Sequence, residues 1–188
     1  SIFGASNFPV AFSVAGGDTA AAFDAGAPVV VPGHETHPGT DELVGAVIRR
    51  AVEASRLPEG VFALLFGTGP GLGQALVTHR RIKAVAFTGS RAAGRAIMDA
   101  AARRTDPIPV FAEMSSTNPV IVLDGAARDR ASTIGRELVA SMSMRTGQMC
   151  TSPGLVLVPP GDSADALVNA AACALANRPA SPLLNLGI

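Results

Sequence analysis

The sequence predicts an α/β protein built around parallel β-sheet. Short aliphatic or β-branched runs alternate with helical patterns along the chain, which is typical of βαβ units. With 188 residues, 48% of them hydrophobic, the chain is long enough to bury a core without disulfides or metals. Two prolines within 105–109 interrupt the alternation. We therefore expect a domain boundary near residue 107 and two domains, 1–107 and 108–188.

The first unit is expected to alternate helices and strands after a strand end at Ser1. The expected elements are helix 10–25, strand 29–31, helix 40–55, strand 61–65, helix 71–78, strand 84–87 and helix 91–104. The helical period is clearest in 40–55, where Leu43, Val47, Ile48 and Val52 recur on one face. An acidic residue in its first turn, Asp41, suits the positive end of the helix dipole.

The second unit is expected to continue the alternation on both sides of a loop that holds a single cysteine. The expected elements are strand 110–112, strand 119–123, helix 126–143, strand 155–158 and helix 163–176. The last helix is alanine-rich, which favours helix formation by propensity and needs no functional explanation.

Charge and cysteine content exclude several classes of function. Basic and acidic residues number 15 each and are scattered singly, so nucleic acid and anionic membrane surfaces are not expected partners. No apolar run approaches the roughly 20 residues of a membrane span, and no signal-peptide pattern is present, so we expect a cytoplasmic protein. The two cysteines have no metal-ligand spacing, which favours free thiols in a reducing compartment and no metal site.

Cys150 is a candidate nucleophile. It lies in the glycine-flanked segment 147–154, directly before the apolar run 155–158. Thiolate is far more reactive than a hydroxyl at neutral pH, and a flexible turn at the mouth of a strand suits a nucleophile. Most lone cysteines are instead buried apolar residues, and we expect Cys173, on the alanine-rich helix, to be one of these.

Two other segments carry polar groups suited to the same chemistry. Asn7 lies in segment 4–9, and an amide donor stabilises an oxyanion without being able to protonate it. Asparagine beside proline also commonly forms an Asx turn. Glu113 follows the apolar run 110–112, where a carboxylate is suited to act as a base. A salt-bridged or surface glutamate is the alternative.

A glycine-rich turn after strand 84–87 is a candidate phosphate-binding site. Gly89 and Gly94 are five residues apart and Ser90 opens the next helix. Backbone N–H groups at a helix start bind pyrophosphate, and a glycine allows close approach. A second glycine cluster, 67–71, is interpreted as a strand-to-helix connection rather than a site.

The cysteine segment closely resembles the catalytic-cysteine loop of the aldehyde dehydrogenase superfamily, and segments 4–9 and 111–116 stand at the separations that this family requires. The resemblance implies a partial cofactor domain with a parallel sheet, followed by the start of the α/β catalytic domain. It implies that Cys150 is the nucleophile, that the Asn7 amide and the Cys150 backbone N–H form the oxyanion hole, and that Glu113 activates the deacylating water. It further implies NADP or NAD as cofactor, phosphate contacts at Gly89, Ser90 and Gly94, a small aldehyde substrate and a homo-oligomeric full-length protein.

The chain departs from the family pattern at Pro32. The family places a lysine after strand 29–31 to hold the cofactor ribose, whereas proline offers neither the charge nor a backbone donor. We expect weaker cofactor binding, with His34, Glu35 and Ser90 contacting the adenosine side. The family's flanking segments are not in this sequence, which is therefore interpreted as the central piece of a longer chain.

Within the superfamily, segments 12–19, 37–40 and 112–119 look most like α-ketoglutaric semialdehyde dehydrogenases and NADP-dependent fatty aldehyde dehydrogenases. The resemblance predicts the central part of an enzyme that oxidises an aldehyde, such as 2-oxoglutarate semialdehyde, through a thiohemiacetal and a thioester on Cys150. Two alternatives stay open. One is a truncated, catalytically silent remnant that at most binds nucleotide or a partner, and the other is an esterase that uses Cys150 and Glu113 without nicotinamide.

Overall fold

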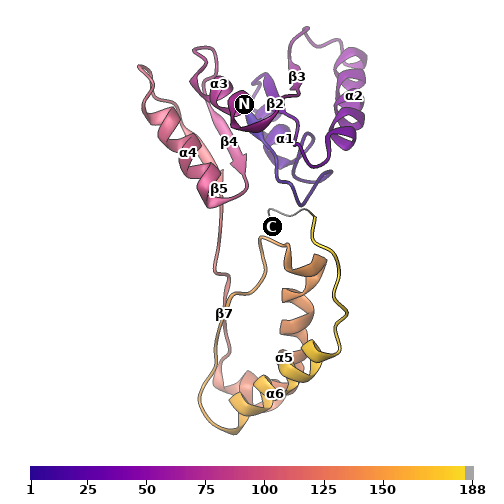
Figure 1. Cartoon of the computed structure of the whole chain (residues 1–188), viewed down its shortest axis with the longest axis vertical. Coiled ribbons are helices and arrows are strands. Elements are labelled where there is room, and N and C mark those ends of the chain that lie inside the picture. Colours follow the sequence, from indigo (N-terminus) through magenta and orange to yellow (C-terminus); the bar gives the residue numbers. More distant parts are fainter. Residues whose placement is uncertain (185–188) are drawn as a thin grey trace. The chain divides into compact units, whose positions relative to one another are not determined.

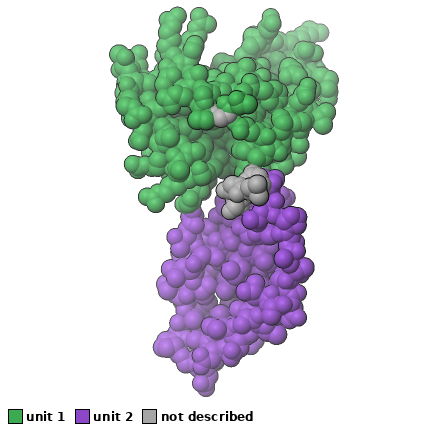
Figure 2. Space-filling view, in the orientation of Figure 1, with its two compact units in different colours: residues 1–115 green, residues 116–188 purple. Residues whose placement is uncertain are grey.

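The computed structural model describes residues 1–184 and divides the chain into two compact units, residues 1–115 and 116–188 (Figures 1 and 2). The division follows Ser115, whereas the sequence pattern places the expected domain boundary near residue 107. The reason is that β5 (Val110–Glu113) pairs in parallel with β4 (Val85–Thr88) and so completes the sheet of unit 1. The prolines before β5 lie in a loop within that unit.

Unit 1 alternates strands and helices as the sequence predicts. Before β4 it contains β1 (Ile2–Phe3), α1 (Gly17–Asp24), β2 (Val29–Pro32), α2 (Pro38–Ala54), β3 (Phe62–Leu65) and α3 (Gly69–Thr78), and α4 (Arg91–Ala102) connects β4 to β5. All of its strand pairs are parallel. β1 pairs with β4 and lies beside β2, because the Ser1 hydroxyl donates to the Val30 carbonyl at 3.1 Å. Backbone hydrogen bonds thus form two parallel sheets, β1-β4-β5 and β2-β3, and the contact between β1 and β2 sets them side by side in the spatial order β3-β2-β1-β4-β5.

The strands of unit 1 carry a separate core on each face. The face packed by α1 and α2 buries Ile2, Val14, Val29, Val31 and Phe62. The face packed by α3 and α4 buries Val77, Val85, Ala100 and Ala101. Neighbouring side chains of a strand point to opposite faces, so Ile2 belongs to the first core and Phe3 packs against the second.

Two expected helices differ in detail. Helix 10–25 begins only at Gly17, because the preceding residues fold back in a loop closed by the Ala5 N–H to Phe12 carbonyl hydrogen bond at 2.6 Å. In α2, Val44, Ile48 and Val52 pack against the core at a spacing of four residues. Leu43 and Val47, expected on the same face, lie on the flank and are 73% and 55% exposed.

The described part of unit 2, residues 116–184, contains two strands, two α-helices and a short 3-10 turn. These are β6 (Pro119–Ile121), α5 (Asp124–Met142), the turn η1 (Met144–Gly147), β7 (Leu155–Leu157) and α6 (Asp162–Ala176). β6 and β7 are parallel, and their inner side chains form a core with α5 and α6. The helices approach closely at Gly135, where an added Cβ atom would clash with the Leu167 carbonyl oxygen.

The outer face of the β6–β7 pair is apolar and exposed. Ile121, Leu155 and Leu157 are 67%, 45% and 51% exposed, whereas their neighbours Val120 and Val156 pack inward. Cys173 on α6 is also exposed, which corrects the expectation of a buried cysteine. This helix packs through only one of its faces, and its small alanine side chains cost little when they are exposed on the other. Cys173 can therefore lie at the surface of an apolar helix.

Candidate active site

A cavity of about 480 Å³ lies in unit 1 at the carboxyl ends of the strands. Its walls are the residues that follow β1, β2, β3 and β4. The strand order reverses direction between β1 and β4, and open parallel sheets bind their ligands beside such a reversal, outside the carboxyl ends. The volume falls in the range of small-molecule sites, about 300–1,000 Å³. Position and size together make this cavity the candidate ligand site of unit 1.

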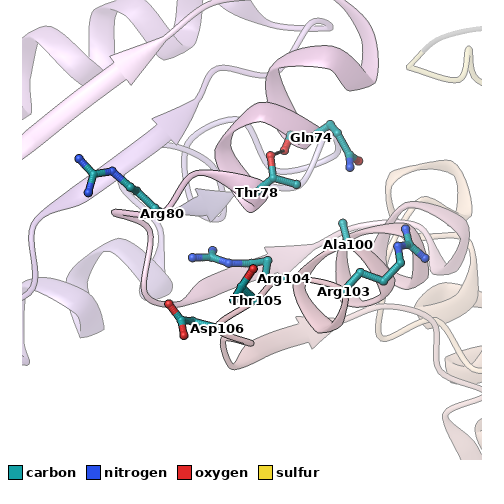
Figure 3. A pocket seen from close by; sticks show the side chains of 8 residues that line it. All are labelled: Gln74, Thr78, Arg80, Ala100, Arg103, Arg104, Thr105 and Asp106. Atoms are coloured by element: carbon teal, nitrogen blue, oxygen red, sulfur yellow. Dashed lines mark hydrogen bonds between the residues drawn. The ribbon is translucent and has the colours of Figure 1, made fainter.

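A second, smaller cavity of about 350 Å³ lies at the opposite edge of the sheet. Figure 3 shows the side chains of Arg80, Arg103 and Arg104 around it, with their guanidinium groups pointing in different directions. Arg80 precedes β4, and the other two precede β5, so this cavity is at the amino ends of the strands. Arg104 donates to the Val77 carbonyl at 2.8 Å and thereby holds α3 to α4. We assign this region a structural role.

The expected phosphate-binding turn forms part of the wall of the larger cavity. Gly89 and Ser90 line it, and Ser90 is the N-cap of α4, where its hydroxyl accepts from the Ala93 N–H at 3.3 Å. A helix start presents N–H groups without intrahelical acceptors, which favours bound phosphate. Gly94 is not among the lining residues. It packs against Met114 instead, whose Sδ would lie 2.6 Å from an added Cβ.

The turn after β2 supplies His34 and Glu35 to the same cavity, and their expected contact with the adenosine side of the cofactor stays a prediction. The Thr36 N–H donates to His34 Nδ1 at 3.2 Å, so the neutral ring carries its proton on Nε2. Burial lowers the pKa of His34, and the stacked His37 ring, 5.1 Å away between centroids, lowers it further. His34 is therefore a neutral hydrogen-bond donor at pH 7.

Pro32, which stands where the family has lysine, also lines the cavity. It causes no break in the sheet. The Val29 and Gly33 N–H groups donate to carbonyls of Val61 and Leu65, both at 2.8 Å, so alternate residues of β2 face β3. The nitrogen of Pro32 faces the other side, where no hydrogen bond of the β2–β3 ladder is lost. The strand accommodates proline here, but the cavity receives neither a cation nor an N–H donor from this position.

Asp41 connects three segments around this region, which sequence reasoning missed. Its carboxyl group is fully buried and accepts hydrogen bonds from the Ser13 hydroxyl at 2.9 Å and the His34 N–H at 2.6 Å. His37 Nδ1 lies 3.1 Å from Oδ1, the carboxylate oxygen that also accepts from Ser13. The sequence predicts only a dipole-compensating residue at the helix start. The only local signal was Ser13, a polar residue inside the apolar run 11–15.

Asn7 lies in the loop that leaves the carboxyl end of β1. The Ala5 to Phe12 hydrogen bond closes this loop, and the Phe8 and Phe12 rings pack edge to face with centroids 5.5 Å apart. Ser13, at the far end of the loop, is anchored on Asp41. Asn7 is half-buried, and its neighbour Ser6 lines the cavity. The loop is thus held in a defined conformation beside the candidate site.

Glu113 is the last residue of β5 and pairs in register with Thr88. Its carbonyl accepts from the Gly89 N–H at 3.0 Å, and its side chain is exposed. Since β1 and β5 are the two neighbours of β4, the loop of Asn7 and the end of β5 lie at the same edge of the sheet as the phosphate-binding turn.

Cys150 lies in unit 2, in the loop between η1 and β7, and its thiol is free and exposed. The Asn118 side chain donates to the carbonyls of Cys150 and Ser152 at 2.7 and 3.0 Å. The sequence pattern predicts no role for Asn118, although it stands in segment 112–119, which carries part of the family resemblance. Because Cys150 and the pair Asn7 and Glu113 belong to different units, their assembly into one site stays a prediction.

The glycine cluster 67–71 is the other feature that sequence reasoning missed. Gly67 and Pro70 line the large cavity together with Leu72, so the segment leading into α3 is part of the candidate site.

Between residues 1 and 184 no group of three or more histidine, cysteine or acidic side chains is placed to hold a metal ion. Among the same residues, no helix has the length and apolar character needed to cross a membrane.

Comparison with known proteins identifies the family. The family model described as "Aldehyde dehydrogenase family" matches residues 2–182. The chain belongs to the aldehyde dehydrogenase family. The match includes the cysteine loop, both segments at 4–9 and 111–116 and the whole of the cavity wall, which confirms the resemblance found in the sequence.

Relatives in this family include enzymes named for one substrate. Alpha-ketoglutaric semialdehyde dehydrogenase 2 of Azospirillum brasilense is 52% identical over 187 residues, which is 100% of this chain and 36% of that protein. Alpha-ketoglutaric semialdehyde dehydrogenase of Acinetobacter baylyi is 49% identical over 156 residues, 83% of this chain and 29% of that protein. The chain thus spans about a third of the length of these relatives.

Solved structures of the aldehyde dehydrogenase fold match most of the chain. A mutant of proline utilization A from Bradyrhizobium japonicum superposes with a TM-score of 0.79 at 30% identity, covering 92% of this chain and 17% of that one. A mutant of 1-pyrroline-5-carboxylate dehydrogenase from Thermus thermophilus gives a TM-score of 0.73 at 24% identity, covering 92% and 33%. The predicted α/β fold class is therefore confirmed.

Proposed function

We propose that this chain supplies the central part of an NAD(P)-dependent aldehyde dehydrogenase that acts on 2-oxoglutarate semialdehyde. The substrate is the one for which the two relatives at 52% and 49% identity are named. The observation that carries the proposal is the short chain segment between Glu113, the expected base, and Asn118, which contacts the loop of the expected nucleophile Cys150. Glu113 ends a strand beside the phosphate-binding turn, and five residues later Asn118 binds the cysteine loop.

The length of this connection limits how far apart the reacting groups can be. Five residues of extended chain span at most about 18 Å, so the backbone of Glu113 stays within that distance of Asn118. Asn118 in turn holds the carbonyl of Cys150. The short connection between Glu113 and Asn118 therefore supports a shared role for Glu113 and the cysteine loop.

In the proposed reaction the Cys150 thiolate attacks the aldehyde carbon and forms a C–S bond, and the carbonyl oxygen becomes an oxyanion. The Asn7 amide donates a hydrogen bond to this oxygen and stabilises its charge. Glu113 takes a proton from the water that later attacks the thioester, which releases the carboxylate and returns the thiol. Bound NAD(P) would supply the hydride acceptor that the oxidation needs.

The cavity of unit 1 fits the cofactor. Ser90 and the first turn of α4 would hold its phosphates, and His34 and Glu35 would contact the adenosine ribose. The neutral His34 ring offers one N–H donor there, which replaces part of what the family lysine would provide.

The test is turnover by a protein in which this chain is joined to the flanking segments of the Azospirillum brasilense relative. With NAD or NADP and a panel of aldehydes, we expect reduced nicotinamide to form fastest with 2-oxoglutarate semialdehyde. Nucleotide binding without turnover of any aldehyde would favour the silent remnant. Ester hydrolysis at the same rate without nucleotide, and no aldehyde oxidation, would favour the esterase.

Pro32→Lys is expected to tighten NAD(P) binding in this joined protein by at least about tenfold. A hydrogen bond to a charged group contributes about 1.5–3 kcal/mol, and about 1.4 kcal/mol corresponds to a factor of ten in Kd. Titration calorimetry gives the Kd values directly. Pro58→Lys, in the exposed loop between α2 and β3, is the control for an added positive charge. Equal Kd values for the Pro32→Lys protein and the parent would mean that position 32 does not limit cofactor affinity.

A further inference from the structure

Hydrogen bonds from two neighbouring segments hold the cysteine loop of unit 2, residues 147–154. On one side, both amide protons of a single side chain are used, because Asn118 Nδ2 donates to the Cys150 carbonyl at 2.7 Å and to the Ser152 carbonyl at 3.0 Å. The adjoining Thr117 carbonyl accepts from the Gly154 N–H at 2.9 Å. On the other side, the Ser152 hydroxyl donates to the Met142 carbonyl at the end of α5, at 3.2 Å.

The backbone at Asn118 is shaped for this contact. Its φ angle is +45°, a left-handed conformation that asparagine tolerates better than most residues. Its own N–H is bonded to the Ser116 hydroxyl at 3.2 Å. Next to it, Gly154 lies so close that an added Cβ would be 3.0 Å from the Thr117 oxygen. The segments around Asn118 and Cys150, 32 residues apart in sequence, are thus in close contact where the Cys150 thiol is exposed.

We propose that Asn118 is a positioning residue for Cys150, an inference that rests on the proposed role of Cys150 as nucleophile. Holding the Cys150 carbonyl fixes the orientation of the following peptide plane, and backbone angles restrict which side-chain rotamer the thiol adopts. The same constraint fixes the angle between the sulfur and the Cys150 N–H, the backbone donor expected to face the oxyanion. Attack on a carbonyl depends on this alignment, whereas simple access to the thiol does not.

Two reagents distinguish the alignment of the Cys150 thiol for attack on a carbonyl from its accessibility to solvent. With p-nitrophenyl acetate the thiolate forms a bond to the ester carbon, p-nitrophenolate leaves, and the thiol proton passes to buffer; the tetrahedral oxyanion on this path needs a placed donor. With iodoacetamide the sulfur displaces iodide and no oxyanion forms. Mass spectrometry of the peptides that contain Cys150 and Cys173 gives both rates for each thiol, since both are exposed.

The variants are Asn118→Gly, which keeps the left-handed backbone without strain, and Asn118→Asp, which keeps the side-chain shape but removes both donors. The chain also offers a matched control, because Asn177 Nδ2 donates to the Cys173 carbonyl at 2.8 Å. We expect both Asn118 variants to lower the ratio of acylation to alkylation at Cys150 by about tenfold or more. Asn177→Gly should leave that ratio unchanged.

The outcomes distinguish the positioning role of Asn118 from the role of Cys150 as nucleophile. If wild-type Cys150 is acylated faster than Cys173 and the Asn118 variants keep the same ratio, Asn118 does not position the thiol. If wild-type Cys150 is acylated no faster than Cys173, the nucleophile assignment itself fails. Circular dichroism checks each fold, and loss of structure in both Asn118 variants would overturn the positioning role in favour of a purely structural one.

Discussion

Replacing Cys150 with serine is expected to reduce aldehyde oxidation by at least about a thousandfold in the protein joined to its relative's flanking segments. Serine keeps the size of the side chain, but its hydroxyl is a far weaker nucleophile at neutral pH than a thiolate. Removing a covalent nucleophile costs orders of magnitude in enzymes of this kind. The measurement is the initial rate of nicotinamide reduction with saturating cofactor and aldehyde.

Cys173→Ser is the matched control, because Cys173 is the second exposed thiol of this chain. It should leave the rate unchanged. Nucleotide binding is expected to survive in Cys150→Ser, since the cavity of unit 1 does not contain this residue. Retention of most of the activity by Cys150→Ser would rule out a covalent mechanism at this position and would redirect attention to chemistry without a thioester.

Asp41→Ala is expected to lower the free energy of unfolding by about 2–5 kcal/mol. The substitution leaves the Ser13 hydroxyl and the His34 N–H without their buried acceptor, and each buried unsatisfied donor costs about 1–3 kcal/mol. It also releases the loop of Asn7 and the turn of His34, which both depend on this carboxyl group. Urea unfolding followed by circular dichroism gives the change.

Asp18→Ala provides the comparison for Asp41→Ala. Asp18 is likewise an acidic residue in the first turn of a helix, α1, but it is exposed. Its loss removes only a favourable interaction with the helix dipole, about 0.3–1 kcal/mol. Similar losses for the two variants would show that Asp41 acts as an ordinary dipole-compensating residue, as the sequence alone predicts, and not as a buried connection.

The order of elements was predictable because each strand of unit 1 is a short apolar run bounded by turn residues. The unit boundary was not, because it depends on pairing between residues far apart in sequence. The prolines near 107 are a strong local signal, yet Val85–Val110 register decides that β5 belongs to unit 1. Helix 10–25 was overestimated for a related reason, since the Ala5 to Phe12 hydrogen bond competes with helix formation and has no signature in hydrophobic periodicity.

The candidate site likewise contains some residues that the local sequence pattern indicates and others that it does not. Gly89, Ser90, His34 and Glu35 all line the cavity, because turns after strands in a parallel sheet meet at one edge, and their contacts with a cofactor stay a prediction. Asp41 was missed because its role comes from burial by segments that are distant along the chain. Asn118 was missed because its amide acts on the backbone of residues 32 positions away, which no local pattern encodes.

The strand order has a consequence for the time course of folding during synthesis. β1 is made first, but its parallel partner is β4, with Ile2 beside Ala86. Most of unit 1 must therefore emerge from the ribosome before β1 can form its parallel ladder with β4, whereas β2 and β3 are separated only by α2 and can associate earlier. Pairings between residues far apart in sequence form slowly, because a long loop must close first. The segment that carries Asn7 is accordingly among the last parts of unit 1 to reach its final position.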